Sequence, residues 1–230
     1  MLAVLYDIHG NLPALEAVLA DAHAQGAGRF LLGGDYAAFG AWPAQTVARL
    51  DELQDATWIR GNWDRWQVDP SSLPDDEVVQ GAARAVLAEL DERTVARLGA
   101  LPPTVSSDET LFCHASPSSD MRSFAPDGAG EDEAELLAGV AEPRVVFGHT
   151  HLQFKRASAG GITLVNPGSV GLPLDGDTRA AYALLHPSGE VELRRVAYDH
   201  AHAAAALRER GEPWTEAIAQ RLENAGLVAS

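Results

Sequence analysis

The chain has 230 residues, a length that suits one large domain and requires no disulfide or metal for folding. Hydrophobic residues make up 46% and charged residues 22%, and no apolar run is long enough to cross a membrane, so we expect a soluble globular protein without a membrane partner. The formal net charge of -16 excludes a long basic footprint for nucleic acid, and we expect no binding to duplex DNA.

The first half of the chain alternates strand and helix patterns. The apolar run Leu2–Tyr6 has no basic flank and predicts a buried strand rather than a signal peptide; with a single cysteine in the chain, we expect a cytoplasmic protein. Further strands are predicted at Arg29–Leu32 and Thr57–Ile59, and helices after Asn11 and from near Pro43. This βαβαβ order predicts a parallel sheet covered by helices.

The second half changes from helices to short strands. Helices are predicted at Glu77–Leu90 and Asp91–Leu98, and a Ser-, Pro-, Asp- and Gly-rich stretch predicts a long loop over 116–130. Strands that suggest a second sheet are predicted at Thr110–Cys113, Arg144–Phe147, Phe154–Ala157, Ile162–Val165, Ala180–Leu185 and Val191–Val196. Two terminal helices are predicted over about 199–226, and because no linker divides the chain we expect a single domain over residues 1–230.

Polar side chains follow the predicted strands at the points where the strands end. These candidate ligands are Asp7, His9, Asp35, Asn62, His114, His149 and His151. Functional sites form at the carboxyl ends of parallel strands, and oxygen and nitrogen donors without thiolate suit Mn, Fe, Zn, Co or Mg. Each cluster alone has a structural alternative, such as a helix cap, a turn or a partly buried histidine, but the combination favours a metal site with several ligands.

The order of these clusters resembles that of the calcineurin-like metallophosphoesterase superfamily. The family order is D-x-H, GD-x, GN-H-D/E, H and GH-x-H. This chain contains Asp7-Ile8-His9, Gly34-Asp35-Tyr36, Gly61-Asn62-Trp63-Asp64, His114 and Gly148-His149-Thr150-His151. The stretch Asn166–Ser169 is similar to the small bacterial and archaeal phosphodiesterase branch, and the resemblance spans about residues 1–170.

The resemblance implies a four-layer α/β/β/α sandwich of two mixed sheets flanked by helices, with a binuclear centre of two divalent metal ions. One ion would bind Asp7, His9 and His151, the other would bind Asn62, His114 and His149, and Asp35 would bridge them. Two ions about 3.5–4 Å apart would activate a hydroxide that attacks phosphorus. Manganese is our first expectation for the metal, and iron, zinc, cobalt, nickel and magnesium are the alternatives.

One position departs from the family pattern. Trp63 stands where the family has a histidine that is held by the next carboxylate, here Asp64, and that is thought to protonate the leaving group. Indole does not titrate near neutral pH, so the usual general acid is missing. Trp63 is a candidate for stacking on the substrate, with simple packing as the equal alternative. Arg60 and Arg122 are candidates for binding phosphate, with surface salt bridges as the alternative.

The leading hypothesis is a metal-dependent phosphodiesterase that acts on a small phosphorylated substrate, with Asp35, Asn62 and Asp64 as catalytic residues. A phosphoprotein phosphatase and a dinucleoside polyphosphate hydrolase are alternatives within the enzyme class. The alternative outside it is a non-catalytic metal-binding scaffold for protein partners, because the retromer subunit of this fold also lacks the catalytic histidine. The complete set of seven candidate ligands argues against a scaffold. The sequence contains no signal for an oligomeric state.

Overall fold

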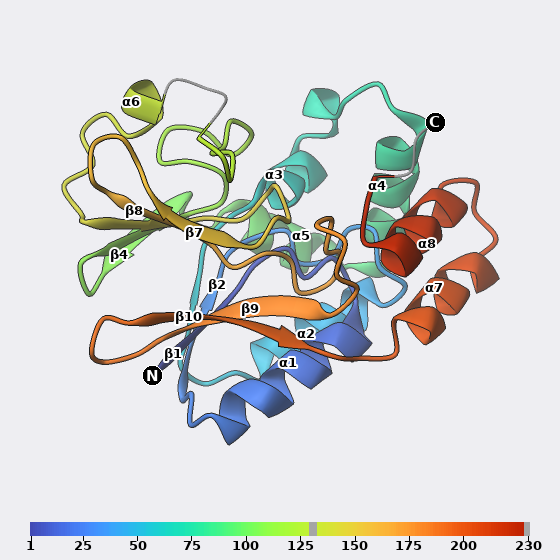
Figure 1. Cartoon of the computed structure of the whole chain (residues 1–230). Coiled ribbons are helices and arrows are strands. Elements are labelled where there is room, and N and C mark those ends of the chain that lie inside the picture. Colours follow the sequence, from blue (N-terminus) through green and yellow to red (C-terminus); the bar gives the residue numbers. More distant parts are fainter. Residues whose placement is uncertain (129–132, 228–230) are drawn as a thin grey trace.

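Two mixed five-stranded sheets form the centre of the computed structural model (Figure 1), which describes residues 1–128 and 133–227. The first sheet has the order β10–β9–β1–β2–β3, and the second has the order β4–β5–β6–β8–β7. Residues 129 and 130, the end of the predicted loop over 116–130, lie outside the described residues. The two sheets flanked by helices confirm the predicted fold class.

The first sheet combines three parallel strands with an antiparallel pair. Its strands are β1 (Leu2–Leu5), β2 (Arg29–Leu32), β3 (Ala56–Trp58), β9 (Ala180–Leu185) and β10 (Val191–Val196). The prediction that the last two strands belong to the second sheet is wrong, because β9 pairs antiparallel with β1 and β10 pairs with β9. All six residues of β9 are buried, which is what a strand in the interior of a covered sheet requires.

The second sheet contains one strand that the sequence did not predict. Its strands are β4 (Thr104–Ser107), β5 (Thr110–Cys113), β6 (Arg144–Val146), β7 (Phe154–Ala157) and β8 (Thr163–Asn166). The unpredicted strand, β4, lies at the sheet edge, is only half-buried and has little apolar content. A tight turn through Asp108 and Glu109, both at positive φ, joins it to β5.

Helices flank the first sheet, and the first of them packs against β9 and β10. They are α1 (Leu12–Ala24), α2 (Pro43–Asp51), α3 (Asn62–Val68), α4 (Glu77–Glu89), α5 (Glu92–Gly99), α7 (His200–Glu209) and α8 (Thr215–Asn224), with a 3-10 turn at Pro70–Ser72. The short α6 (Glu133–Leu136) lies over the second sheet (Figure 1). Where the sequence predicted an element, its ends differ by one or two residues at several places; α3 and α6 were not predicted. None of the helices in the described residues is long and apolar enough to cross a membrane.

The core follows from the alternation of side chains along the strands. Ala3 and Leu5 of β1 pack against the helices, whereas Val4 between them packs against the second sheet with Phe112 and Val146. A third apolar cluster, which includes Phe124 and Leu136, lies between the second sheet and its outer layer. This packing leaves the loops at the carboxyl ends of β1, β2, β3, β5 and β6 on one edge of the sandwich.

Candidate metal centre

The seven candidate ligands lie together at the carboxyl edge of the two sheets. Asp7 and His9 follow β1, Asp35 follows β2, Asn62 begins α3 after β3, His114 follows β5, and His149 and His151 follow β6. All are buried except His149, which is half-buried. Two groups have ligand atoms within 4.8 Å of one another: Asp7, His9 and His151, and Asp7, Asp35 and His114.

The two carboxylates form the middle of the cluster. Asp7 Oδ1 lies 3.5 Å from His151 Nε2 and 3.9 Å from both His9 Nε2 and His114 Nε2. Asp35 Oδ2 lies 3.3 Å from His114 Nε2 and 4.0 Å from His9 Nε2. Asp35 therefore lies close to a histidine of each predicted ligand set. It is a candidate bridge.

The amide of Asn62 joins the two remaining histidines to this cluster. Its Oδ1 lies 3.0 Å from His114 Nε2 and 3.0 Å from His149 Nδ1. The amide oxygen, the carboxylates and these ring nitrogens thus face one small volume.

Backbone carbonyls orient three of the histidine rings. Because a carbonyl only accepts hydrogen bonds, the ring nitrogen that faces it, Nδ1, carries the proton. In a neutral ring the other nitrogen, Nε2, then presents its lone pair to the cluster. The bonds run from His9 to Ala38 (3.1 Å), from His114 to Gly33 (2.9 Å) and from His151 to Leu172 (2.6 Å).

The donor set fits a cation, because acceptor atoms of the described residues face one another at short distance. The Nε2 atoms of His9 and His151 lie 3.1 Å apart, and Asp7 Oδ1 is fully buried without a hydrogen-bond partner among the described residues. An orphaned buried carboxylate oxygen is costly unless a positive charge faces it. Nitrogen and oxygen ligands held by carbonyls behind them are typical of divalent metal sites.

The pKa values of two candidate ligands are shifted in opposite directions. Burial lowers the pKa of His114, but the carboxylates of Asp35 and Asp7 together outweigh burial and raise it to about 10. Burial and the neighbouring His151 lower the pKa of His9 to about 4, which favours the neutral ring that a metal needs.

The backbone of the site is strained. Five of the seven candidate ligands have positive φ, a region that few residues other than glycine adopt: Asp7 (53°), His9 (51°), Asp35 (58°), His149 (66°) and His151 (60°). Phe39, whose ring lies 5.4 Å from that of His9, has φ 77°. Such strain persists only where the surroundings hold the chain in place, and it gathers at functional sites.

A family model described as the calcineurin-like phosphoesterase superfamily domain matches residues 1–190. The chain belongs to this family. Members of the family are in general metal-dependent phosphoesterases, and the two ligand groups above are candidate metal sites of that kind. Helices α7 and α8 lie beyond the matched residues.

Relatives of this calcineurin-like chain include proteins of bacteria and archaea. An uncharacterized protein of Methanocaldococcus jannaschii is 28% identical over 225 residues, which cover 86% of this chain and 88% of that protein. The crystal structure of a metallophosphoesterase from Sphaerobacter thermophilus is 26% identical with a TM-score of 0.78, over 97% of this chain and 98% of that chain. A hypothetical protein from Pyrococcus horikoshii shares the fold, with a TM-score of 0.82 at 19% identity over 99% and 100% of the two chains. Both structural matches cover nearly the whole of this chain, so they include most of its C-terminal helices α7 and α8.

Asp64 lies beneath the candidate centre of this calcineurin-like domain, where it holds two loops together. Its fully buried carboxylate accepts hydrogen bonds from the backbone N–H groups of Gly61 (2.8 Å) and Asp35 (3.0 Å). Burial and the adjacent Asp35 carboxylate raise the pKa of Asp64 to about 7. The Asp64 carboxylate thus contacts both the backbone of Asp35 and the residue that precedes α3.

Trp63 is buried behind the centre. Its side chain is 4% exposed and packs against Phe39, with ring centroids 4.5 Å apart, and against Trp66, at 5.3 Å. Its backbone N–H donates to Asp35 Oδ1 at 3.0 Å. Little of the indole is therefore available to stack on a substrate, and packing accounts for most of its surface.

The two candidate phosphate-binding arginines lie in different surroundings. Arg122 forms an exposed ion pair with Glu135, with an Nη1–Oε1 distance of 2.7 Å. Arg60 lines a hollow of about 350 Å³ whose wall includes His114, and its Nη1 donates to the carbonyl of Gly99 at 3.2 Å. The hollow places Arg60 beside the candidate centre, whereas Arg122 belongs to an ion pair.

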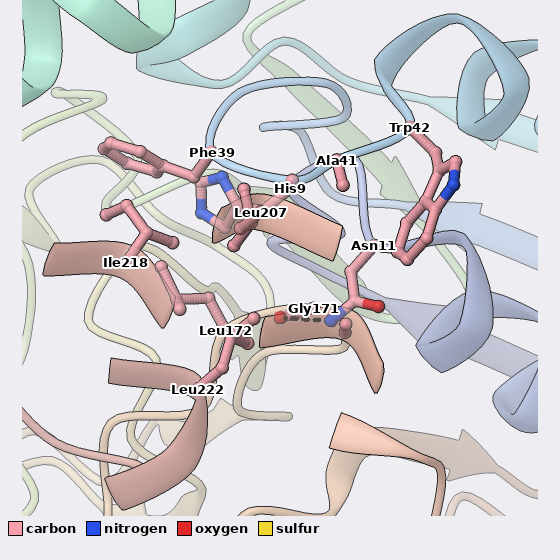
Figure 2. Close-up of a pocket in the computed structure, with 12 residues that line it drawn as sticks. His9, Asn11, Phe39, Ala41, Trp42, Gly171, Leu172, Leu207, Ile218 and Leu222 are labelled. Carbon is pink, nitrogen blue, oxygen red and sulfur yellow. Dashed lines mark hydrogen bonds between the residues drawn. The ribbon is translucent and has the colours of Figure 1, made fainter. Parts of the chain in front are cut away.

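Two more hollows lie beside the candidate ligands. Figure 2 shows an apolar crevice next to His9, lined by Phe39, Leu172 and, from α7 and α8, Leu207, Ile218 and Leu222. It holds about 10 Å³, room for about one water. An open hollow of about 360 Å³ lies against His149, between Phe124 and Leu152.

Some of the residues that hold the ligand loops in place could be found from the sequence, and others could not. Ser169 Oγ donates to the Asp7 carbonyl at 2.7 Å, and Asn166 Nδ2 donates to the Gly148 carbonyl at 3.0 Å, so the Asn166–Ser169 stretch holds the loops of both ligand clusters. Phe39 had no sequence signal, because its part in the site depends on a strained loop conformation that only the structure shows.

Proposed function

We propose that the protein is a phosphodiesterase that acts on small phosphorylated molecules through a centre of two divalent metal ions. The observation that carries the proposal is the convergence of buried acceptors, with Asp7 Oδ1 orphaned and the Nε2 atoms of His9 and His151 facing each other at 3.1 Å. Membership of the calcineurin-like family supports phosphoester hydrolysis as the reaction.

The assignment of residues to the two ions is the one that the family resemblance implies, and the distances within the cluster support it. Asp7, His9 and His151 would hold one ion, Asn62, His114 and His149 would hold the other, and Asp35 would bridge them. When bound, divalent cations neutralise charge on a phosphoryl oxygen and lower the pKa of water to supply a nucleophile. The mixture of imidazole, amide and carboxylate favours manganese, with iron, zinc, cobalt, nickel and magnesium as alternatives.

Other residues of the chain hold the candidate ligands in place for the reaction. The carbonyls of Ala38 and Leu172 fix the rings of His9 and His151, and Asp64 fixes the loop of Asp35 through its backbone N–H. Small displacements of such groups lower rates strongly, because the reacting atoms must be aligned. Phe39 packs against the ring of His9 and is itself packed against Trp63.

The experiment is a substrate screen on metal-loaded protein. We expect hydrolysis of bis(p-nitrophenyl) phosphate, with slower hydrolysis of p-nitrophenyl phosphate and of a phosphoserine peptide. His151→Ala should abolish activity, whereas His23→Ala, an exposed histidine of α1, should retain it. If the protein binds both ions but hydrolyses none of a panel of diesters, monoesters and anhydrides, the proposal fails and a metal-binding scaffold becomes the better hypothesis.

A further inference from the structure

The hollow beside His114 is polar and has a net positive wall. It holds about 350 Å³ and is lined by Arg60, Arg65, Thr104, His114 and the segment 116–120, with two prolines. The positive charge of Arg65 is balanced by the Asp120 carboxylate, which accepts two hydrogen bonds from it, of 2.6 Å at Nε and 3.0 Å at Nη2.

Arg60 is the side chain that makes this wall positive. Among the described residues no carboxylate lies within salt-bridge distance of it, and its Nε is buried without a hydrogen-bond partner. The Gly99 carbonyl takes one of its five donors. In a chain with 33 acidic residues and 17 basic ones, an arginine left without a carboxylate beside a candidate metal ligand is suited to an anion from outside the protein.

The neighbouring hydroxyl groups fit the same kind of ligand. Within the described part of the chain, the side chains of Thr104 and Ser118 make no hydrogen bond, and both line the hollow. Hydroxyl and guanidinium groups together bind phosphate oxygens. The apolar crevice next to His9 (Figure 2) offers neither charge nor space for such a group.

The hollow also limits which leaving groups can depart into it. Apart from His114, a candidate ligand, its side chains are arginines, hydroxyls and the Asp120 carboxylate that is bound to Arg65. Histidine is the residue type that most often protonates a leaving group, and His114 is the one histidine among these lining residues. A group that leaves through the hollow must therefore be stable as an anion.

We propose that the Arg60 hollow is a subsite for a second phosphate, and that the substrates are phosphoanhydrides, in which the attacked phosphorus is joined through oxygen to another phosphoryl group. This inference rests on the proposed function of the site. In the reaction, water forms a new O–P bond and releases a proton to solvent. The P–O bond to the bridging oxygen breaks, and its electron pair stays on that oxygen. The second phosphate leaves as an anion held by Arg60.

The test measures binding rather than turnover. The probes are imidodiphosphate, whose P–N–P link resists hydrolysis, and inorganic phosphate, titrated calorimetrically into manganese-loaded protein with metal content checked afterwards. Arg60→Gln removes the charge but keeps a donor for the Gly99 carbonyl, and Arg60→Lys keeps the charge. Arg84→Gln is the control, because Arg84 is an exposed arginine of α4.

We expect Arg60→Gln to weaken imidodiphosphate binding by about tenfold or more and to weaken phosphate binding much less, because the metal centre alone holds a single phosphate. Arg60→Lys should recover part of the loss, and Arg84→Gln should match the wild type. Equal weakening of both probes, or of neither, would overturn the subsite. If the wild type hydrolyses nothing but shows this selectivity, the subsite stands and the proposed function fails.

Discussion

At the scale of single residues, the candidate centre depends on backbone positions that place side chains unusually close together. A Cβ atom at Gly61 would lie 2.1 Å from Asp35 Oδ1, and one at Gly148 would lie 2.5 Å from Asp7 Oδ2. These glycines allow two carboxylates to approach loops from other strands. The candidate ligands at positive φ and the glycines beside them act together. Their unfavourable backbone conformations allow the side chains to form a compact cluster.

Gly61→Ala tests this close approach. The added methyl group would displace the Asp35 carboxylate, and because a shift of about 1 Å can lower a rate by about a hundredfold, we expect a loss of that order in activity and a weaker affinity for metal. Gly28→Ala is the matched control, since nothing lies within 4 Å of its Cβ position. The checks are metal titration and hydrolysis of an aryl diester. Wild-type metal affinity in Gly61→Ala would show that Asp35 is not confined as described.

Trp63 leads to a prediction about leaving groups. With indole in place of a titratable side chain, activity should fall steeply as the leaving-group pKa rises. Trp63→His should help alkyl esters most, because an acid is worth about 10²–10⁴-fold for poor leaving groups. The variant should also lose stability, by less than the about 3–5 kcal/mol of removing the whole ring, because Trp63 packs against Phe39 and Trp66.

A leaving-group series on both proteins, with metal loading and thermal unfolding recorded for each, measures these effects. Asp64 already accepts two backbone hydrogen bonds, so it is not free to orient the new imidazole fully and the gain should be partial. A flat dependence in the wild type would mean that another group protonates the leaving oxygen.

At the scale of elements, an ion-pair network fastens α1 to the first sheet. Asp21 of α1 accepts hydrogen bonds from Arg194 of β10, at Nε (2.8 Å) and Nη2 (3.1 Å), and from the Tyr182 hydroxyl of β9 (2.5 Å). The hydrogen bonds from Arg194, with that from Tyr182, hold the pKa of Asp21 below its ordinary value despite the cost of partial burial. The network joins the start of the chain to strands more than 150 residues later.

Asp21→Asn should therefore make stability less dependent on pH. Because the folded-state pKa of Asp21 is lower than the unfolded value near 3.8, its contribution is present above that value and is lost as the pH falls through the folded-state pKa. We expect the variant to be less stable by about 1–2 kcal/mol at pH 7 and the difference to shrink below about pH 4. The check is denaturant unfolding across that range. Asp55→Asn, in the exposed pair with Arg29, should change little.

The strands show which parts of the fold can be predicted from local sequence patterns and which cannot. Alternating and continuous apolar runs predicted most strands, because a buried strand must place such side chains on its faces. They did not predict that β9 would pair with β1, since this depends on which sheet edge is free when the chain returns. They also missed β4, whose polar residues suit an edge strand as well as a loop.

For the site, the order of polar clusters predicted which side chains gather, because parallel strands end at one edge. Their roles as metal ligands stay a prediction. The burial of Trp63, the backbone bonds of Asp64 and the hollow beside Arg60 depend on how distant loops pack, which no local pattern contains.

At the scale of the whole molecule, basic residues are few, and most of the arginines that the structure describes form ion pairs. Arg208 contacts Glu216 and Glu223, and Arg210 contacts Glu89. Surface arginines paired in this way add little net positive potential to a chain of charge -16.

We therefore expect no appreciable binding to random duplex DNA at physiological salt, because binding needs a row of cations that displaces counterions from phosphates. Fluorescence anisotropy with a labelled duplex over a salt series is the check. Submicromolar binding that weakens with salt would contradict this account of the surface.

The central claim is that seven side chains hold two divalent ions, and the metal content of the reconstituted protein tests it most directly. Elemental analysis after reconstitution with manganese should give about two ions per chain, and Asp35→Asn should lose both, because Asp35 is the proposed bridge between them. The ions should also raise the unfolding temperature, since they bind only the folded state. A fully folded wild-type protein that binds one ion or none under saturating manganese would contradict the account.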